Sequence, residues 1–348
     1  MQAKKSATDR KVKVCGITVF STKLRKYKIT RILGIPCYVV QRKKEFFKYF
    51  ESKIGTQYDA VFVSRHNIGE TLVYLAYLKL WIRAVGAKKT AILVWREKDL
   101  PLYKMFIEED CDILRFEVAQ SDLNAFFQQD VTFFGNTRVI CPTFRIAESM
   151  KIDWQKGLSV NFVSTILRSM GLHETEKCVT NLPKISSSIR HKAEVAIASL
   201  TQGRPYVLLC PEANSLKSLP GAFWKDLSQK FIEKGFFVFV NALDASICIE
   251  NTVVIHCPID ELYVYAQNSD RIVSMASGLG VLLSTSGNSC DLIYTDFVSR
   301  SIGYDSTMVK DIYSVKHLPS MLIKNSIVRE WDAKHYSEEK LTEMIMQN

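Results

Sequence analysis

Short apolar runs alternate with stretches of helical periodicity along most of the chain. In the first half, the predicted strands are residues 59–64, 90–95, 112–118 and 138–142, and the predicted helices are residues 70–85, 100–108, 121–129 and 160–170. Continuous β-branched runs separated by helices are typical of a parallel sheet that is covered on both faces. The first half is therefore predicted to form one α/β lobe.

The alternation of apolar runs and helical stretches stops between residues 171 and 203 and then starts again. The interruption contains Pro183, a run of serines and a polar helix that ends near Gly203. After it, the predicted strands are residues 206–210, 236–241, 252–257, 271–273 and 292–295, and the predicted helices are residues 223–234, 260–268 and 278–284. The expected fold class is α/β with two Rossmann-like lobes and a cleft between them, because open α/β sheets bind ligands beyond the carboxyl ends of their strands.

This pattern also sets the expected domain boundaries. We expect a first lobe at residues 1–175, a linker helix region at 176–203, a second lobe at 204–328 and a C-terminal helix at 329–348. For that last helix, packing back on the first lobe is an open alternative.

Composition places the chain among ordinary globular proteins. It has 348 residues, of which 47% are hydrophobic and 24% charged, so disordered and collagen-like classes are excluded. The chain has no run of about 18 apolar residues and no apolar stretch behind the first Met, so we expect a soluble, cytoplasmic protein. The nine cysteines include no C-x-x-C pair, which favours buried, reduced thiols.

The positive charge is concentrated at the start of the chain. Residues 1–53 hold fifteen of the 46 Lys and Arg residues but only three of the 36 acids, a net charge of +12, and the rest of the chain is nearly neutral. Such a segment can meet an anionic membrane, nucleic acid or a phosphorylated substrate, and a solvated basic face is the plain alternative. The residues that we assign to this surface are Lys23, Arg25, Lys26, Lys28 and Arg31.

The loop after the predicted strand 206–210 carries the first candidate chemistry. It contains Pro211, Asn214, Ser215 and Lys217 and leads into a helix. Small polar groups, a Lys and the free N–H groups of a helix start favour an anion. A plain strand-to-helix connection is the alternative.

A second candidate anion site lies at Ser277–Gly278, which follows a predicted strand and opens another helix. Ser277 can cap that helix, and Gly278 allows a ligand or another backbone to approach closely. A Ser-Gly pair at a helix start is also common without any ligand.

Glu70 is the candidate general base, with His66 as a second candidate beside it. Glu70 stands at the start of the helix at 70–85, where a first-turn acid stabilised by the helix dipole is the alternative. The chain contains no Walker loop, no G-x-S-x-G and no H-E-x-x-H, and its six His residues are too dispersed for a metal cluster. Asp110–Cys111–Asp112 is interpreted as a solvated turn, so we expect no metal and no cofactor.

Together these motifs resemble those of a known enzyme family. The segments are N-I-G-E-T-L from residue 67, P-E-A-N-S-L-K-S-L-P-G-A-F-W from residue 211, and S-M-A-S-G-L from residue 274. In this order they look like a GT-B glycosyltransferase of the heptosyltransferase-like (family 9-like) group, which builds bacterial surface polysaccharide and lipopolysaccharide. In that group a Gly-Asp usually takes the place of Gly69–Glu70, and a loop like the one around Lys217 opens the donor domain.

The resemblance implies a nucleotide-sugar donor in the second lobe and a glycan or lipid-linked acceptor on the first. It also implies that the transfer reaction takes place at the cytoplasmic face of the inner membrane. There the basic segment would contact the acceptor or anionic lipid. Relatives often carry an Arg before the Ser-Gly where this chain has Ala276, so a cation for the donor phosphate is either missing or supplied by Lys217 or Arg271. A GT-B-like protein that has lost activity and serves as a binding or assembly partner is the alternative. Nucleic-acid binding rests on the basic segment alone, and we expect no nucleic-acid partner.

Overall fold

The computed structural model divides the chain into two compact units, residues 1–58 and 59–348. It describes residues 10–14, 17–24, 27–32, 35–37, 51–52, 54, 57–64, 67–94, 96–107, 111–115, 131–134, 137–140, 150, 160–172, 181–242, 249–298 and 309–347.

The first unit contains an antiparallel sheet that the sequence analysis did not predict. Its strands run in the order β1-β2-β3-β4, with bounds β1 Arg10–Val14, β2 Ile17–Leu24, β3 Tyr27–Ile32 and β4 Ile35–Cys37. Two-residue connections between short strands favour pairing with the next strand, because an antiparallel pair needs no crossover. We expected this segment to belong to the first lobe, whereas it forms a unit of its own.

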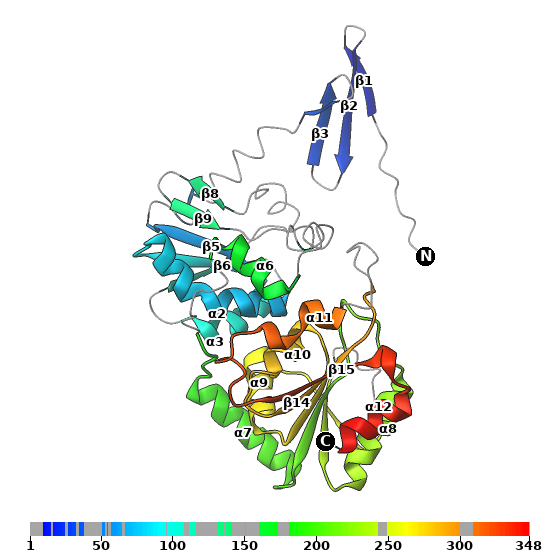
Figure 1. Ribbon diagram of the computed structural model, residues 1–348. Coiled ribbons are helices and arrows are strands. Elements are labelled where there is room, and N and C mark those ends of the chain that lie inside the picture. The colour runs from blue at the N-terminus through cyan, green and yellow to red at the C-terminus, as the bar shows by residue number, and fades with distance from the viewer. Residues whose placement is uncertain are drawn as a thin grey trace. The chain divides into compact units, whose positions relative to one another are not determined.

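The second unit begins with the first α/β lobe (Figure 1). Its sheet has the order β7-β6-β5-β9-β8. The elements are β5 Ala60–Ser64, α2 Ile68–Val85, β6 Thr90–Val94, α3 Leu100–Phe106, β7 Cys111–Arg115, β8 Val131–Phe134, β9 Thr137–Ile140 and α6 Phe162–Ser169. The parallel pairing of β5, β6, β7 and β9 was predicted from the sequence, and the antiparallel strand β8 is an addition.

The second lobe is built on a six-stranded parallel sheet of order β12-β11-β10-β13-β14-β15. Its strands are β10 Tyr206–Cys210, β11 Phe237–Asn241, β12 Val253–Ile255, β13 Arg271–Met275, β14 Ser289–Tyr294 and β15 Ile327–Asp332. Its longer helices are α7 Ser187–Thr201, α8 Gly221–Glu233, α9 Ile259–Asn268 and α12 Glu338–Gln347, and the short ones are α10 Gly278–Leu283, α11 Val309–Tyr313 and the 3-10 turn η5 Ala333–His335. Most of these elements match the predicted ones within a few residues.

The C-terminal segment differs from the expectation of a single helix at residues 329–348. Residues Ile327–Asp332 extend the sheet as β15, and only the remainder is helical. Helix α12 lies against α8 of the same lobe, where the Lys234 ammonium donates to the carbonyl of Met346 at 2.8 Å (Figure 1). It buries Leu341 and Ile345, because these two apolar residues share one face of the helix.

The segment between the lobes is anchored to both of them. The backbone N–H of Asn181 donates to the carbonyl of Ala76 in α2 at 3.2 Å, and that of Lys184 donates to Met105 in α3 at 2.6 Å. Helix α7 then packs on α9, where Lys192 and Glu261 form an ion pair at 2.7 Å. Helix α7, expected to be part of the linker, therefore packs as part of the second lobe.

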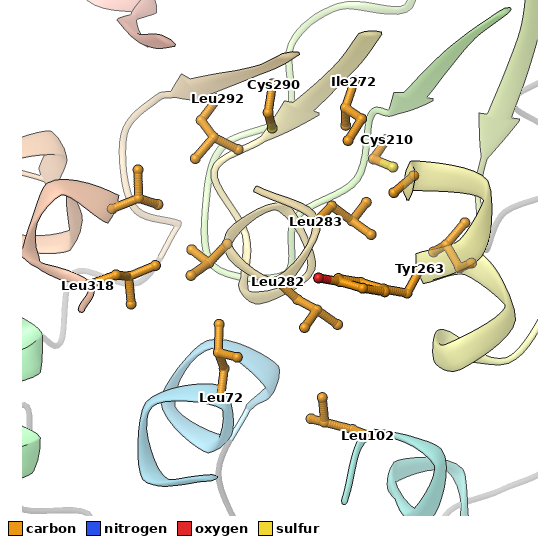
Figure 2. Packing of buried hydrophobic residues seen from close by; sticks show 14 of the residues in the cluster. Leu72, Leu102, Cys210, Tyr263, Ile272, Leu282, Leu283, Cys290, Leu292 and Leu318 are labelled. Carbon is orange, nitrogen blue, oxygen red and sulfur yellow. The ribbon is translucent and has the colours of Figure 1, made fainter. Parts of the chain in front are cut away.

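The two lobes share one hydrophobic core. Leu72 of α2 and Leu102 of α3 lie in the same buried cluster as Leu282 of α10 and face it in Figure 2. On the far side of α10, Cys210 and Cys290 are buried in the same cluster, and burial raises the pKa of the Cys210 thiol. For these two cysteines, the prediction of buried thiols is confirmed.

Candidate functional site

Helix α2 presents Glu70 in its first turn. The helix begins at Ile68 after Asn67, whose carbonyl accepts the N–H of Thr71 at 3.0 Å. Glu70 is half-buried, and its burial raises the pKa of its carboxyl, against a smaller lowering by its own backbone N–H. A carboxyl whose pKa is raised accepts a proton more readily than an ordinary Glu, which suits a general base.

Helix α10 starts where β13 ends, at the carboxyl edge of the second sheet. The hydroxyl of Ser277 accepts the N–H of Gly280 at 3.2 Å and so caps the helix, as the sequence predicts. Gly280 has no room for a side chain, because a Cβ there would lie 2.5 Å from the carbonyl oxygen of Met275. The helix is therefore pressed tightly into the turn that follows β13.

The starts of α2 and α10 touch each other through two glycines. A Cβ added at Gly278 would lie 2.5 Å from the backbone nitrogen of Gly69, and one added at Gly69 would lie 3.2 Å from the Cα of Gly278. Any side chain at either position would separate the two helices. The contact brings together two sequence-predicted sites from different lobes, because Glu70 follows Gly69 and Ser277 precedes Gly278.

The loop after β10 is fixed by the segment that follows β14. The N–H of Lys217 donates to the carbonyl of Asp296 at 2.7 Å, and the N–H of Val298 donates to the carbonyl of Ser215 at 3.0 Å. The Thr295 hydroxyl donates to the carbonyl of Lys217 at 2.6 Å. Within this fixed backbone, Pro211 is buried and the side chains of Asn214, Ser215 and Lys217 are exposed. The loop can therefore present those three side chains to a ligand.

This loop and Ser277 lie at the same edge of the second sheet. Strand β10 pairs in parallel with β13, with Cys210 opposite Ser274, so both strands end at one side. Among the described residues, no group of three or more His, Cys, Asp and Glu side chains is placed to hold a metal ion.

Comparisons with known proteins identify the fold. No family model and no curated protein sequence matches the chain. The solved structure of the ADP-heptose LPS heptosyltransferase II of E. coli matches 83% of this chain and 97% of its own, with a TM-score of 0.54 at 10% identity. A glycosyl transferase family 9 structure from Veillonella parvula matches 83% of this chain and 96% of its own, with a TM-score of 0.54 at 11% identity. The fold is GT-B.

The share of the chain that matches the GT-B structures equals the share that the second unit makes up. Residues 59–348 make up about 83% of the 348-residue chain, the same share that both solved structures cover. The basic unit of residues 1–58 is comparable in length to the part that the match leaves out.

The predicted basic surface falls in this smaller unit. Lys23 lies in β2, and Lys28 and Arg31 lie in β3, with Lys23 directly opposite Lys28 in the strand register. Arg25 and Lys26 lie outside the described residues, and so does His66. None of the helices in the described part of the chain is both long enough and apolar enough to cross a membrane.

Arg271 is not at the carboxyl edge of the second sheet, contrary to one of our two expectations for a phosphate-binding cation. It opens β13, so it stands at the opposite end of that strand from Ser277. There its Nε donates to the buried carboxylate of Asp291 at 2.6 Å, while its buried Nη2 has no hydrogen-bond partner. Trp331 Nε1 also donates to Asp291, at 2.8 Å. Arg271 is thus part of a buried charge cluster, and Lys217 is left as the candidate cation.

Sequence reasoning missed two charged residues at the carboxyl edge of the second sheet. Lys334 in η5 forms an ion pair with Asp296 at 3.0 Å, and Asp296 is the residue whose carbonyl holds Lys217. No sequence signal pointed to this pair, because Lys334 follows a strand that was not predicted.

Proposed function

We propose that this protein is a glycosyltransferase. It moves a sugar from a nucleotide-sugar donor to a glycan or lipid-linked acceptor in the synthesis of bacterial surface polysaccharide or lipopolysaccharide, and it needs no metal. The contact between Gly69 and Gly278 carries the proposal, because it places the residue before Glu70, whose carboxyl pKa is raised, against the helix start that Ser277 caps in the other lobe. The fold agrees with this, since the E. coli structure bears the name of an ADP-heptose LPS heptosyltransferase.

In the proposed reaction, Glu70 acts as the general base. Its carboxylate takes the proton of the acceptor hydroxyl as the acceptor oxygen bonds to the anomeric carbon of the donor sugar. The bond from that carbon to the donor phosphate oxygen breaks, and its electron pair leaves with the nucleoside diphosphate. His66 stays a second candidate for the same proton.

The second lobe holds the donor in this proposal. Asn214, Ser215 and Lys217 present exposed polar groups on a backbone that is fixed to the segment after β14. The Lys217 ammonium would stabilise the charge of the leaving diphosphate, and Ser277 and Gly278 would contact it from the neighbouring strand end.

The proposed acceptor side includes the basic unit. Lys23 in β2 stands opposite Lys28 in β3 in the strand register, so two of the assigned cations belong to paired strands. Near an anionic membrane each Lys or Arg contributes about 1 kcal/mol to binding. Replacing the five assigned cations with Gln should therefore abolish binding to vesicles that contain anionic lipid while nucleotide affinity stays unchanged. Equal binding of both proteins at the same salt concentration would remove the membrane from the proposal.

Calorimetry with UDP, GDP, ADP and their sugar conjugates tests the core of the proposal. At least one nucleotide should bind, and Lys217→Ala should weaken its binding by about 1–3 kcal/mol, the contribution of a hydrogen bond to a charged group. Lys225→Ala, at an exposed position of α8, is the matched control and should bind like the unaltered protein. If no nucleotide or nucleotide sugar binds above the buffer signal, the inactive binding or assembly protein becomes the better explanation.

A further inference from the structure

The side chains at the proposed donor loop depend on a neighbouring segment for their position. Asn214, Ser215 and Lys217 are all exposed, so their own packing does not fix them. Residues 295–298 hold the loop instead, through the three hydrogen bonds described above and an antiparallel bridge between Leu216 and Phe297. Whatever fixes this segment therefore fixes Lys217.

One such fixing contact is the ion pair between Asp296 and Lys334. The backbone of Lys334 is itself held, because its N–H donates to the Asp332 carboxylate at 3.2 Å. From there its ammonium reaches Asp296 at 3.0 Å, and the side chains are 23% exposed for Lys334 and 48% for Asp296. The pair joins the end of β15 to the segment that clamps the donor loop.

The charge of Asp296 matters as much as its position. Its carboxylate belongs to the residue whose carbonyl accepts the N–H of Lys217, so its backbone lies beside the loop proposed to hold a diphosphate. An uncompensated carboxylate there would repel an anionic ligand and oppose the attraction of Lys217. The Lys334 ammonium offsets that repulsion.

We infer that Lys334 is a positioning residue for the donor: it acts through Asp296, whose charge it neutralises on the segment that presents Lys217. This inference rests on the proposed function, because it assumes that a nucleoside diphosphate binds at the loop. Lys334 does not touch the ligand in this scheme.

A double-substitution cycle tests the inference with the nucleoside diphosphate that the unaltered protein binds best. Lys334→Ala should weaken binding about three- to fivefold, as expected for one partly exposed charge pair, and the loss should shrink at high salt. Asp296→Asn alone should improve affinity slightly, because it removes a negative charge from the segment beside the loop and leaves the Lys334 ammonium unpaired with it. The double variant should return close to the unaltered affinity, because it removes the repulsion that Lys334 otherwise offsets. Lys334→Arg should retain most of the binding.

The controls separate this inference from the proposed function. Lys340→Ala removes a comparable ion pair with Glu343, 3.1 Å long and on α12, and should change nothing. Thermal unfolding of each variant shows whether it is folded. If Lys334→Ala binds normally, or if Asp296→Asn fails to restore binding in the double variant, the inference is wrong while the proposed function stands. If the unaltered protein binds no nucleotide, the proposed function fails, and this inference fails with it.

Discussion

Replacing Gly278 with Ala should destabilise the protein because two backbones meet at that position. The added Cβ would lie 2.5 Å from the Gly69 nitrogen, 3.2 Å from the Ile68 Cβ and 3.3 Å from the Ile68 carbonyl carbon. The shortest of these falls roughly 1 Å below an ordinary van der Waals contact, and no side-chain rotation can relieve a clash with a backbone atom. Helix α2 must therefore move away from α10, which breaks well-packed contacts between the lobes. Overpacking of this kind costs about 1–3 kcal/mol.

Thermal unfolding followed by circular dichroism measures this cost. For a unit of this size, we expect the midpoint to fall by roughly 2–6 °C. Gly221→Ala is the matched control, because Gly221 also begins a helix and a Cβ there meets no atom within 4 Å. That variant should stay within about 0.5 kcal/mol of the unaltered protein. A Gly278→Ala protein that melts together with the Gly221→Ala control would refute the close approach of α2 and α10.

Two further substitutions test the charges of the second unit. Glu70→Gln should lower the transfer rate by about 10²–10⁴-fold while nucleotide binding stays intact, and the unaltered rate should rise with pH through the raised pKa of Glu70. Between the ordinary pKa of Glu70 in the unfolded chain and its raised pKa in the folded protein, the folded state holds a proton that the unfolded chain has lost. The unaltered protein should therefore lose stability as pH rises through this range. The Gln variant should not lose stability over this pH range. If the unfolding midpoints of the unaltered protein and the Gln variant change with pH in the same way, the burial of Glu70 is contradicted. Asp291→Asn should cost about 3–5 kcal/mol in urea unfolding, because Arg271 is left buried without its counter-charge. Asp226→Asn, at an exposed ion pair of α8, should cost less than about 1 kcal/mol, and equal losses would show that Asp291 is not a buried partner.

The parallel strands were predictable because their signal is local. Strands β5, β6 and β10 are continuous apolar runs that are buried on both faces of their sheets, and such runs stand out against helical periodicity. Strand β15 has no such signal. Its sequence I-V-R-E-W-D is half charged, and those charges find partners only in the fold: Arg329 donates to Ser289, and Glu330 accepts from Tyr294. Its identity as a strand depends on residues that lie far away in the chain.

The candidate site was predictable in its parts and not in its assembly. The cap at Ser277 and the first-turn position of Glu70 follow from neighbouring residues, so the sequence could place each on its helix. The meeting of Gly69 and Gly278 depends on how two lobes pack, and no spacing along the chain encodes that. The ion pair between Asp296 and Lys334 could not be predicted from the sequence for the same reason.

The common core of the two lobes has a consequence for how the second unit unfolds. Helix α2 buries Leu72, Tyr74 and Trp81, and it is the element that joins the first lobe to α10. Because one apolar cluster runs through both lobes, losing either lobe would expose the surface that the other needs, and unfolding should be cooperative across residues 59–348. Neither lobe is then an autonomous folding module, although each has a complete sheet of its own. A fragment cut between them would present the face of α2 or of α10 to water and would be prone to aggregate.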